Sequence, residues 1–236
     1  MKIFELSGHN PLAEGNRRLV FQHPDDDDLV IKVLKPGTYR PDGQPRRSRP
    51  YKLARREGAY IYHTRELNEY VAARIANRSP HDLPICTVQG LVETDLGLGL
   101  AVEKITAGDG RLAPSLRQVV AGGRFDGPTR RLFERFIEDM IDKHVVVYEL
   151  SVDNIVLADD GVSARRFVCI DGMGSRTLIP VKEWSKWLNA RKIRSFREDF
   201  LRRWAGEAAD APWQRAATGM LRLLAAPILV VFLAME

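Results

Sequence analysis

The chain has 236 residues, of which 44% are hydrophobic and 28% are charged, with a formal net charge of +5. This is a globular composition without low-complexity tracts or internal repeats, and the length suffices for one large domain or two lobes. The pI near 9.3 indicates a mildly basic surface, which attracts nucleic acid, phosphorylated ligands or anionic membranes, although a solvated surface rich in arginine is the simpler explanation.

The first part of the chain is expected to form a sheet with one helix. Residues 11–21 predict a strand, a turn at Gly15 and a returning strand, and residues 29–34 predict a buried strand. Residues 35–50 are rich in Pro, Gly and Arg, which indicates a loop. Residues 86–93 and 98–105 predict a hairpin.

A helix is expected within residues 51–75, with a division at Gly58. Residues that recur at three- and four-residue steps are expected on one face, with charged residues on the opposite side. The recurring residues are Leu67, Tyr70, Val71 and Arg74.

The remainder is expected to be mostly helical. A helix should begin at 116–120, and residues 129–143 predict a strongly amphipathic helix. Short strands at 145–157 and 167–171 should flank turns. Residues 180–204 are expected to be helical, with Trp184, Trp187 and Leu188 in a buried stripe. The apolar face of the helix at 129–143 would hold Leu132, Phe133, Phe136, Ile137, Met140 and Ile141.

Cysteine usage and the termini favour a cytoplasmic protein. Cys86 and Cys169 lie far apart among apolar neighbours, with no disulfide framework or metal spacing. The first residues lack the apolar core of a signal peptide. Residues 223–235 are almost wholly apolar, but they fall short of the ~20 residues needed to span a bilayer. A buried terminal helix is therefore favoured over membrane contact.

Lys32 lies in the predicted strand 29–34 and is a candidate phosphate ligand. An ammonium group on a buried strand can reach over a cleft to two phosphate groups, and it needs a carboxylate to fix its side chain. Glu66, on the following helix, is the expected partner, and Glu69 is the alternative. A single Lys in a strand is more often a solvent-facing residue. The phosphate-binding role of Lys32 is therefore supported only in combination with the other candidate site residues.

Two further segments are typical of nucleotide binding. A strand through Glu103 and Ile105 runs into a linker with Gly108 and Gly110, as in a kinase hinge, where backbone groups would bind an adenine. Gly15 is the one glycine of a loop that could cover phosphates, which usually needs several glycines for close approach. Arg17 and Arg18 follow Gly15 and could compensate with charge.

Asn154 and Asp171 are candidate magnesium ligands on neighbouring turns. The segment 148–157 has the spacing of the kinase stretch H-R-D-L-K-P-E-N-I-L, with Asn154 at the metal-binding Asn and Glu149 at the catalytic Asp. Asp171, before Gly172, ends a predicted buried strand like the Asp of D-F-G, without its Phe. Magnesium takes hard oxygen ligands and keeps several waters. An Asp-Gly pair alone is more often a plain turn.

Three stretches of the chain resemble the PhoP regulatory network protein YrbL family, over about residues 5–204. They are residues 92–99, the loop around Asn154, and residues 177–187, which carry Trp-Ser-Lys-Trp after Leu-Ile-Pro. The resemblance implies an α+β, bilobal protein-kinase-like fold. Its N-lobe, residues 1–105, would be an antiparallel sheet plus one helix, and its C-lobe, residues 106–236, would be reduced and mostly helical. By position it implies site roles for Lys32, Glu66, Asn154 and Asp171, with Glu149 as a candidate.

The leading functional prediction is a kinase-like protein that binds ATP and Mg²⁺ and transfers phosphoryl groups. The alternative is a pseudokinase, a regulatory binding module, which is favoured by Val147 and Tyr148 in place of His and Arg. A third reading, a nucleic-acid or partner adaptor built on basic residues between 46 and 56, lacks any base-reading motif and ranks last. The acceptor is a small molecule or a protein, and no A-P-E segment marks a protein-substrate platform.

Overall fold

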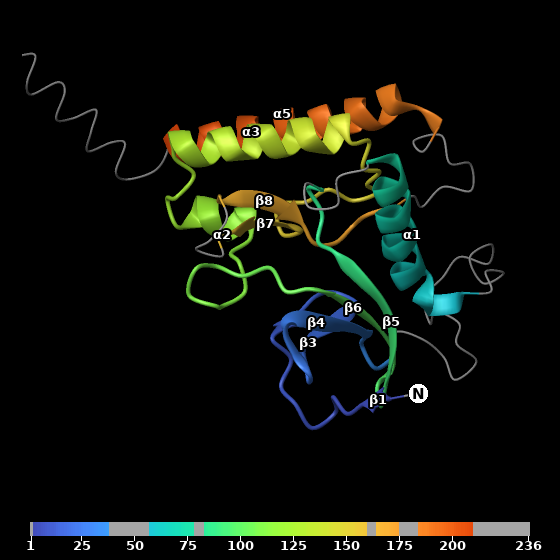
Figure 1. The fold of residues 1–236 in the computed structure, drawn as a ribbon. Helices are drawn as coiled ribbons and strands as arrows, with labels where there is room; N and C mark the ends of the chain where they lie inside the picture. Colours follow the sequence, from blue (N-terminus) through green and yellow to red (C-terminus); the bar gives the residue numbers. More distant parts are fainter. Residues whose placement is uncertain (1, 38–56, 78–82, 160–163, 175–183, 210–236) are drawn as a thin grey trace, which may run out of the picture. The chain divides into compact units, whose positions relative to one another are not determined.

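The first half of the chain forms a six-stranded sheet in the order β1-β5-β6-β4-β3-β2 (Figure 1). Neighbouring strands are antiparallel, except that β1 pairs with β5 in parallel. The hairpins predicted from residues 11–21 and 86–105 are confirmed. The strands are β1 (Ile3–Phe4), β2 (Ala13–Glu14), β3 (Arg18–His23), β4 (Asp26–Leu34), β5 (Val88–Thr94) and β6 (Gly97–Glu103).

The computed structural model describes residues 2–37, 57–77, 83–159, 164–174 and 184–209, without the side chains of 205–209. The basic residues of 46–56 and the apolar segment 223–235 lie outside these ranges. The chain divides into two compact units, Met1–Ile193 and Arg194–Glu236, and the expected lobe boundary near residue 105 lies inside the first. No helix in the described ranges is long and apolar enough to cross a membrane.

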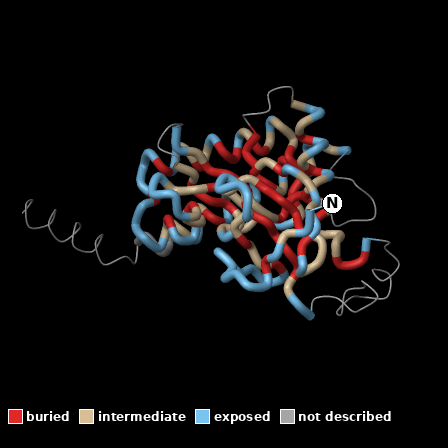
Figure 2. Tube along the Cα trace, turned by 60° about the horizontal axis from the view of Figure 1, so that its bottom comes forward, coloured by how far each residue is buried: buried red, intermediate tan, exposed pale blue. Residues whose placement is uncertain are grey.

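The β-rich run that ends β4 builds the core of the sheet. β-branched side chains pack well on a pleated surface, and Ile31 and Val33 are fully buried together with Leu6 and Phe21. Because β4 lies between β6 and β3, Lys32 sits on an interior strand rather than at an edge. In Figure 2 the buried residues lie mostly in the interior of the traced chain, with exposed residues around them.

A 3₁₀ turn (Gly58–Tyr60) leads into α1 (Ile61–Ala76), which contacts β5. The expected apolar face of this helix is wrong, because Val71 is exposed. The buried side chains are instead His63, Glu66, Glu69 and Ala73. The two glutamates face inward because the interior offers them cationic and N–H partners.

The second half holds α2 (Leu116–Ala121), α3 (Gly127–Asp142) and a two-stranded sheet of β7 (Ile155–Ala158) and β8 (Arg166–Cys169). The predicted amphipathic helix is confirmed. On its buried side, Phe133 packs edge to face against Phe167 of β8, with ring centroids 6.0 Å apart. Asp126 caps α3 by accepting a hydrogen bond from Thr129 N.

β8 is joined to the segment before β5, which sets the position of the turn that follows β8. Cys169 N donates to Pro84 O at 2.8 Å, and Cys86 N donates to Cys169 O at 3.1 Å. Both cysteines are free and buried, and burial raises the pKa of the Cys86 thiol to about 12. Asp171 follows β8 and is thereby placed beside the larger sheet.

The last described helix, α5 (Lys186–Ala209), runs from the first unit into the second. The expected buried stripe is wrong, since Trp184 is 74% exposed and Trp187 is 63% exposed. The helix begins after Trp184, and the buried positions of its first turns are Asn189, Ala190 and Ile193. The mixed α+β class is confirmed.

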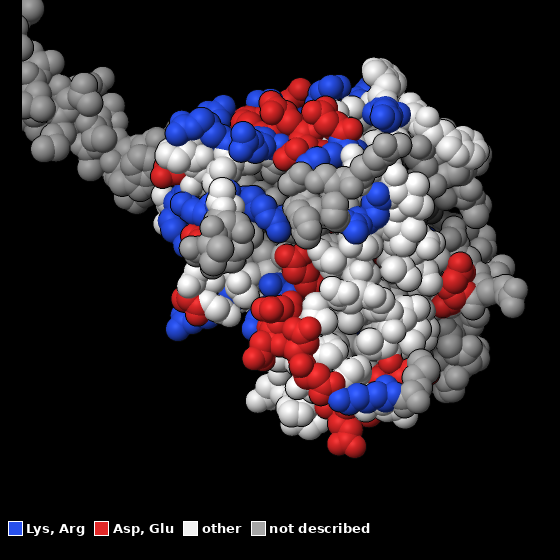
Figure 3. All heavy atoms as spheres, viewed as in Figure 1, with Lys and Arg blue, Asp and Glu red and all other residues white. Residues whose placement is uncertain are grey.

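Charged residues of both signs share the surface. On the face in Figure 3, Asp and Glu form a band over the strands, and Lys and Arg alternate with acidic side chains above. The described part of this face therefore shows no continuous basic band of the kind that tracks a nucleic-acid backbone.

Candidate functional site

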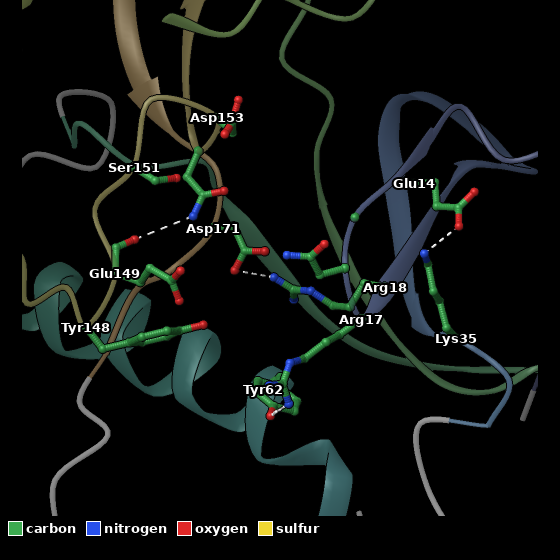
Figure 4. Close-up of a pocket in the computed structure, with 13 residues that line it drawn as sticks. Glu14, Arg17, Arg18, Lys35, Tyr62, Tyr148, Glu149, Ser151, Asp153 and Asp171 are labelled. Atoms are coloured by element: carbon green, nitrogen blue, oxygen red, sulfur yellow. Dashed lines mark hydrogen bonds and ion pairs between the residues drawn. The ribbon is translucent and has the colours of Figure 1, made fainter. Parts of the chain in front are cut away.

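A polar pocket of about 760 Å³ opens beside the β2–β3 turn (Figure 4). It is lined by residues 14–18 and Lys35 on one side, by Tyr62 of α1, and by residues of 148–154 with Asp171 on the other side. The structure thus brings together four residues that the sequence singled out: Gly15, Glu149, Asn154 and Asp171.

Lys32 and Glu66 form a buried ion pair next to this pocket. The Lys32 ammonium contacts Glu66 Oε1 and donates to Ile170 O at 2.6 Å. Both side chains are almost fully enclosed. The expected Lys–Glu pairing is therefore present in the structure, with Glu66 and not Glu69 as the partner. Glu69 instead accepts a hydrogen bond from Val146 N at 2.7 Å.

Arg18 joins this pair to Asp171, a contact that was not predicted from the sequence. Its NH1 donates to Glu66 Oε2 at 2.7 Å, and its NH2 lies 2.5 Å from Asp171 Oδ1. Arg18 is only 7% exposed. Two cations and two carboxylates thus form one cluster, hereafter the charge cluster: Arg18, Lys32, Glu66 and Asp171. The first three are buried, and the Asp171 side chain is 39% exposed.

Electrostatics in the charge cluster favour the ionised forms of Lys32 and Asp171. Burial is the largest influence on the pKa of Lys32 and lowers it, but the neighbouring charges, Glu66 foremost, together outweigh burial and raise that pKa. Burial likewise works against the Asp171 carboxylate, and the charges of Arg18 and Lys32 outweigh it, so that the pKa of Asp171 is lowered. A buried charge is tolerated when it is paired and hydrogen-bonded.

The strand register explains why Arg18 lies inside while Arg17 does not. Val20 pairs with Lys32 across β3 and β4, and Arg18 stands two residues before Val20. Alternate residues of a strand share a face, so Arg18 and Lys32 project from the same side of the sheet. Arg17 precedes β3 and is exposed, and its guanidinium lies over the Tyr62 ring, 4.9 Å from the ring centroid (Figure 4).

The Asp171–Gly172 turn is fastened to the Glu149 segment. Gly172 O accepts hydrogen bonds from Tyr148 N at 3.0 Å and Glu149 N at 3.3 Å, and Ile170 N donates to Asn154 O at 2.9 Å. Gly172 has φ +84°, and a Cβ there would lie 2.2 Å from Glu149 O. Glycine is required at this position, since it allows both the left-handed backbone and the close approach.

Asn154 and Asp171 offer a donor set that fits magnesium. Asn154 Nδ2 donates to Glu149 O at 3.5 Å, which leaves the amide oxygen as a potential ligand. The described residues hold no group of three or more His, Cys, Asp or Glu side chains that could bind a metal. Two hard oxygens suffice for Mg²⁺, because it keeps several waters and takes other ligands from substrate phosphates.

Side chains outside the kinase pattern brace residues 145–149. Asn189 Nδ2 donates to Val145 O at 2.8 Å, and Lys192 Nζ donates to Val147 O at 2.9 Å and also to Tyr148 O. α5 thus holds this segment through its backbone carbonyls. No local motif marks Asn189 or Lys192, so neither could be predicted from the sequence.

The expected hinge residues lie away from the pocket. Glu103 and Ile105 are not among its lining residues, and their backbone is engaged elsewhere: Glu103 N donates to Thr87 O, and Ile105 O accepts from Ala113 N. The Glu103 carboxylate accepts from Thr87 N at 2.9 Å. At Gly15 a Cβ would meet Arg18 O at 3.6 Å, an ordinary contact, so this loop does not require glycine there.

Comparison with known proteins identifies relatives over most of the chain. A family model described as PhoP regulatory network protein YrbL matches residues 4–205. The proteins named "Uncharacterized protein YrbL" of Escherichia coli (strain K12) and of Shigella flexneri are each 28% identical over 193 residues, covering 80% of this chain and 82% of the relative. The predicted family is confirmed: this chain belongs to the family of the PhoP regulatory network protein YrbL.

Proposed function

We propose that this chain is a protein-kinase-like nucleotide-binding protein, which takes ATP with Mg²⁺ into the polar pocket and transfers a phosphoryl group to an acceptor. In this proposal residues 1–105 act as the N-lobe and residues 106–236 as the C-lobe of a bilobal fold. The observation that carries the proposal is the buried Lys32–Glu66 ion pair beside Asp171. A strand lysine held by a helix glutamate next to a metal-binding aspartate is the constellation that phosphoryl transfer needs.

Most of the predicted residues have a role in this proposal. Glu66 orients Lys32, which neutralises phosphate charge, and Asn154 and Asp171 would hold magnesium. The metal would neutralise charge on the phosphates during transfer. Gly15 belongs to the loop that would lie nearest the phosphates. The adenine contact predicted at Glu103 and Ile105 gains no support, because neither residue lines the pocket and their backbone groups bond elsewhere. Because catalysis of this kind is mostly positioning and charge, an imperfect base lowers the rate without preventing the reaction.

Glu149 is the proposed group that orients or deprotonates the acceptor hydroxyl. It is exposed and lines the pocket, and its backbone is fixed by Gly172 O. Glu149→Gln should abolish transfer while sparing nucleotide binding, because the amide keeps the shape and loses the basicity. Unchanged turnover in that variant would remove Glu149 from the mechanism.

Thermal unfolding with ATP tests the binding step. At ATP about 100 times the dissociation constant, binding adds about 2.7 kcal/mol, which for a domain of this size raises Tm by roughly 5–10 °C. The shift should vanish with EDTA and in Asp171→Asn. Mg²⁺ without ATP serves as the control. No shift at millimolar Mg²⁺–ATP would contradict the proposal.

A pseudokinase that binds nucleotide without transfer is the second candidate. Arg18 on Asp171 favours it, because this contact occupies a carboxylate that a kinase keeps for its metal, and Val147 and Tyr148 stand where kinases have His and Arg. Incubation with Mg²⁺ and γ-labelled ATP separates the two. Label transferred to the chain, to water or to small hydroxyl acceptors supports the enzyme, and binding without any γ-phosphate release supports the binding module.

A further inference from the structure

Arg18 has no role in the proposed mechanism. Its guanidinium is buried, and it touches both carboxylates of the charge cluster. Its contact with Asp171 Oδ1, 2.5 Å long, is made to the carboxylate proposed to bind metal. Asp171 Oδ1 also accepts from Gly172 N at 2.5 Å, so this oxygen already has two donors.

The charges of the cluster show what happens if Asp171 changes partner. Lys32 and Glu66 balance one another, and Arg18 balances Asp171. If Asp171 binds a divalent cation, the Arg18 guanidinium is left beside a metal without its second carboxylate. An arginine stays in an enclosed site only with an anion to pair with, and a phosphate suits its two-armed geometry.

The position of Arg18 allows that exchange. Arg18 lines the pocket together with Arg17 and Lys35, and in Figure 4 its guanidinium points from the β2–β3 side across to Asp171. Lys35 is paired with Glu14 and Arg17 stacks on Tyr62. Arg18 is thus the pocket cation whose partner would be removed by metal binding.

We propose that Arg18 exchanges partners during binding: it holds Asp171 until a divalent cation takes that carboxylate, and it then pairs with a phosphate of the metal-bound polyphosphate. This rests on the proposed function. Arg18 is then a gate for the metal ligand and a phosphate ligand in turn. Metal and polyphosphate bind cooperatively. The metal releases Arg18 from Asp171, and the phosphate then pairs with the released Arg18.

Mn²⁺ binding without nucleotide, followed by the electron paramagnetic resonance signal of free Mn²⁺, tests the first half. Arg18→Gln should tighten Mn²⁺ binding by at least about tenfold, since a charged competitor for Asp171 is removed. The double variant Arg18→Gln/Asp171→Asn should lose the gain. Arg17→Gln is the matched control, as it removes a charge from the same pocket without touching Asp171, and it should change Mn²⁺ affinity less than about twofold.

ATP binding at saturating Mn²⁺ tests the second half by calorimetry. With the metal site filled in both proteins, Arg18→Gln should bind ATP about tenfold more weakly than the wild type. In EDTA neither protein should bind ATP measurably, so the weakening by Arg18→Gln depends on the metal. At saturating Mn²⁺, Arg17→Gln should weaken ATP binding less than Arg18→Gln does.

Two results would overturn the inference: Mn²⁺ binding that Arg18→Gln does not tighten, or ATP binding at saturating Mn²⁺ that it does not weaken. Wild-type protein that binds no ATP at any Mn²⁺ concentration would overturn the proposed function instead, and tighter Mn²⁺ binding by Arg18→Gln would still show that Arg18 holds Asp171. If Arg18→Gln fails to fold, Arg18→Lys replaces it. Lysine keeps the charge for Glu66 but lacks the two-armed fork that also holds Asp171, so Mn²⁺ binding should again tighten, by less than in Arg18→Gln because the charge remains.

Discussion

Glu66 accepts from two cations at once, Lys32 on one carboxylate oxygen and Arg18 on the other. Removing the shared carboxylate leaves two buried positive charges, whereas removing Lys32 leaves Glu66 still paired with Arg18. Glu66→Gln should therefore lower the free energy of unfolding by about 3–5 kcal/mol, and Lys32→Met should cost less. Urea unfolding of both variants measures the difference. Equal losses would show that the two cations do not share Glu66.

Gly172 and Gly15 are a matched pair for the backbone of the site. Gly172→Ala places a methyl group 2.2 Å from Glu149 O at φ +84°, so the Asp171 turn and the Glu149 segment must separate. It should destabilise the protein by more than about 1 kcal/mol and weaken nucleotide binding. Gly15→Ala fits without a clash and should leave stability unchanged. Urea midpoints decide, and a Gly172→Ala protein as stable as Gly15→Ala would contradict this account.

At the residue scale, the pairing of charged residues was easier to predict than the direction in which each side chain points. The Lys32–Glu66 pairing followed from residue type and order along the chain, and the structure shows it. Arg18 could not be separated from Arg17 by sequence, because only the structure shows that β3 begins at Arg18 and that its side chain is buried on the face of Lys32. That face is fixed by the register of β3 against β4, which depends on tertiary pairing. The roles of Glu149, Asn154 and Asp171 remain predictions.

The first turns of α5 act on the site through the backbone of residues 145–148. Lys192→Met keeps the apolar stem and removes the donor to Val147 O and Tyr148 O. The amides of Tyr148 and Glu149, which donate to Gly172 O, should exchange with solvent on the order of tenfold faster, as the charged hydrogen bonds to these two carbonyls are lost.

Arg191→Gln is the control for that change. Arg191 is exposed and lies over the Trp187 ring, 5.6 Å from its centroid, so its loss should leave both amides unchanged. Hydrogen–deuterium exchange read by mass spectrometry or NMR gives the rates. Equal exchange in the Lys192→Met protein and the wild type would show that α5 does not brace this segment.

At the element scale, periodicity predicted elements better than the faces they bury. α3 was predicted with its buried side because its apolar residues alone decide that side. α1 and α5 were predicted with the wrong buried side, because α1 buries glutamates for Lys32, Arg18 and Val146 N, and α5 buries Asn189 for Val145 O. A pattern of apolar residues cannot indicate a face that is buried by polar contacts.

His63 links the stability of the whole molecule to pH. It is fully buried on α1, with Nε2 3.2 Å from Leu98 O, and burial together with the charge of Arg18 lowers its pKa to about 3. The unfolded chain takes up this proton near pH 6.5, whereas the folded protein takes it up only near 3. Stability is therefore fully present above about pH 6.5 and is lost as pH falls toward 3, at up to about 1.4 kcal/mol per pH unit.

His63→Gln isolates this term, since it keeps a donor for Leu98 O and cannot titrate. Between pH 6.5 and 4 the variant should lose less stability on acidification than the wild type, while the carboxylates contribute equally to both. Urea unfolding across that range measures the two slopes. Parallel curves would contradict the assignment to His63.

At the scale of the whole molecule, family and class were predictable, because long stretches of sequence carry both. The order of the six strands was not predictable, since it depends on which strand edges pair. Strand β1 pairs in parallel with β5, which lies far from it along the chain. The hydrogen bond between Cys86 N and Cys169 O, which holds β8, was also not predictable. No sequence pattern indicates a backbone contact between residues so far apart.

The charge cluster also sets an order of events during synthesis. Lys32 and Glu66 are 34 residues apart, and Arg18 and Glu66 are 48 apart, but Lys32 meets Ile170 across 138 residues. A nascent chain on the ribosome can pair Arg18 and Lys32 with Glu66 long before Asp171 has been translated. Long-range contacts of this kind form late because loop closure must come first. The pocket is thus completed only after Asp171 has been translated, and a chain released before residue 171 would lack the site.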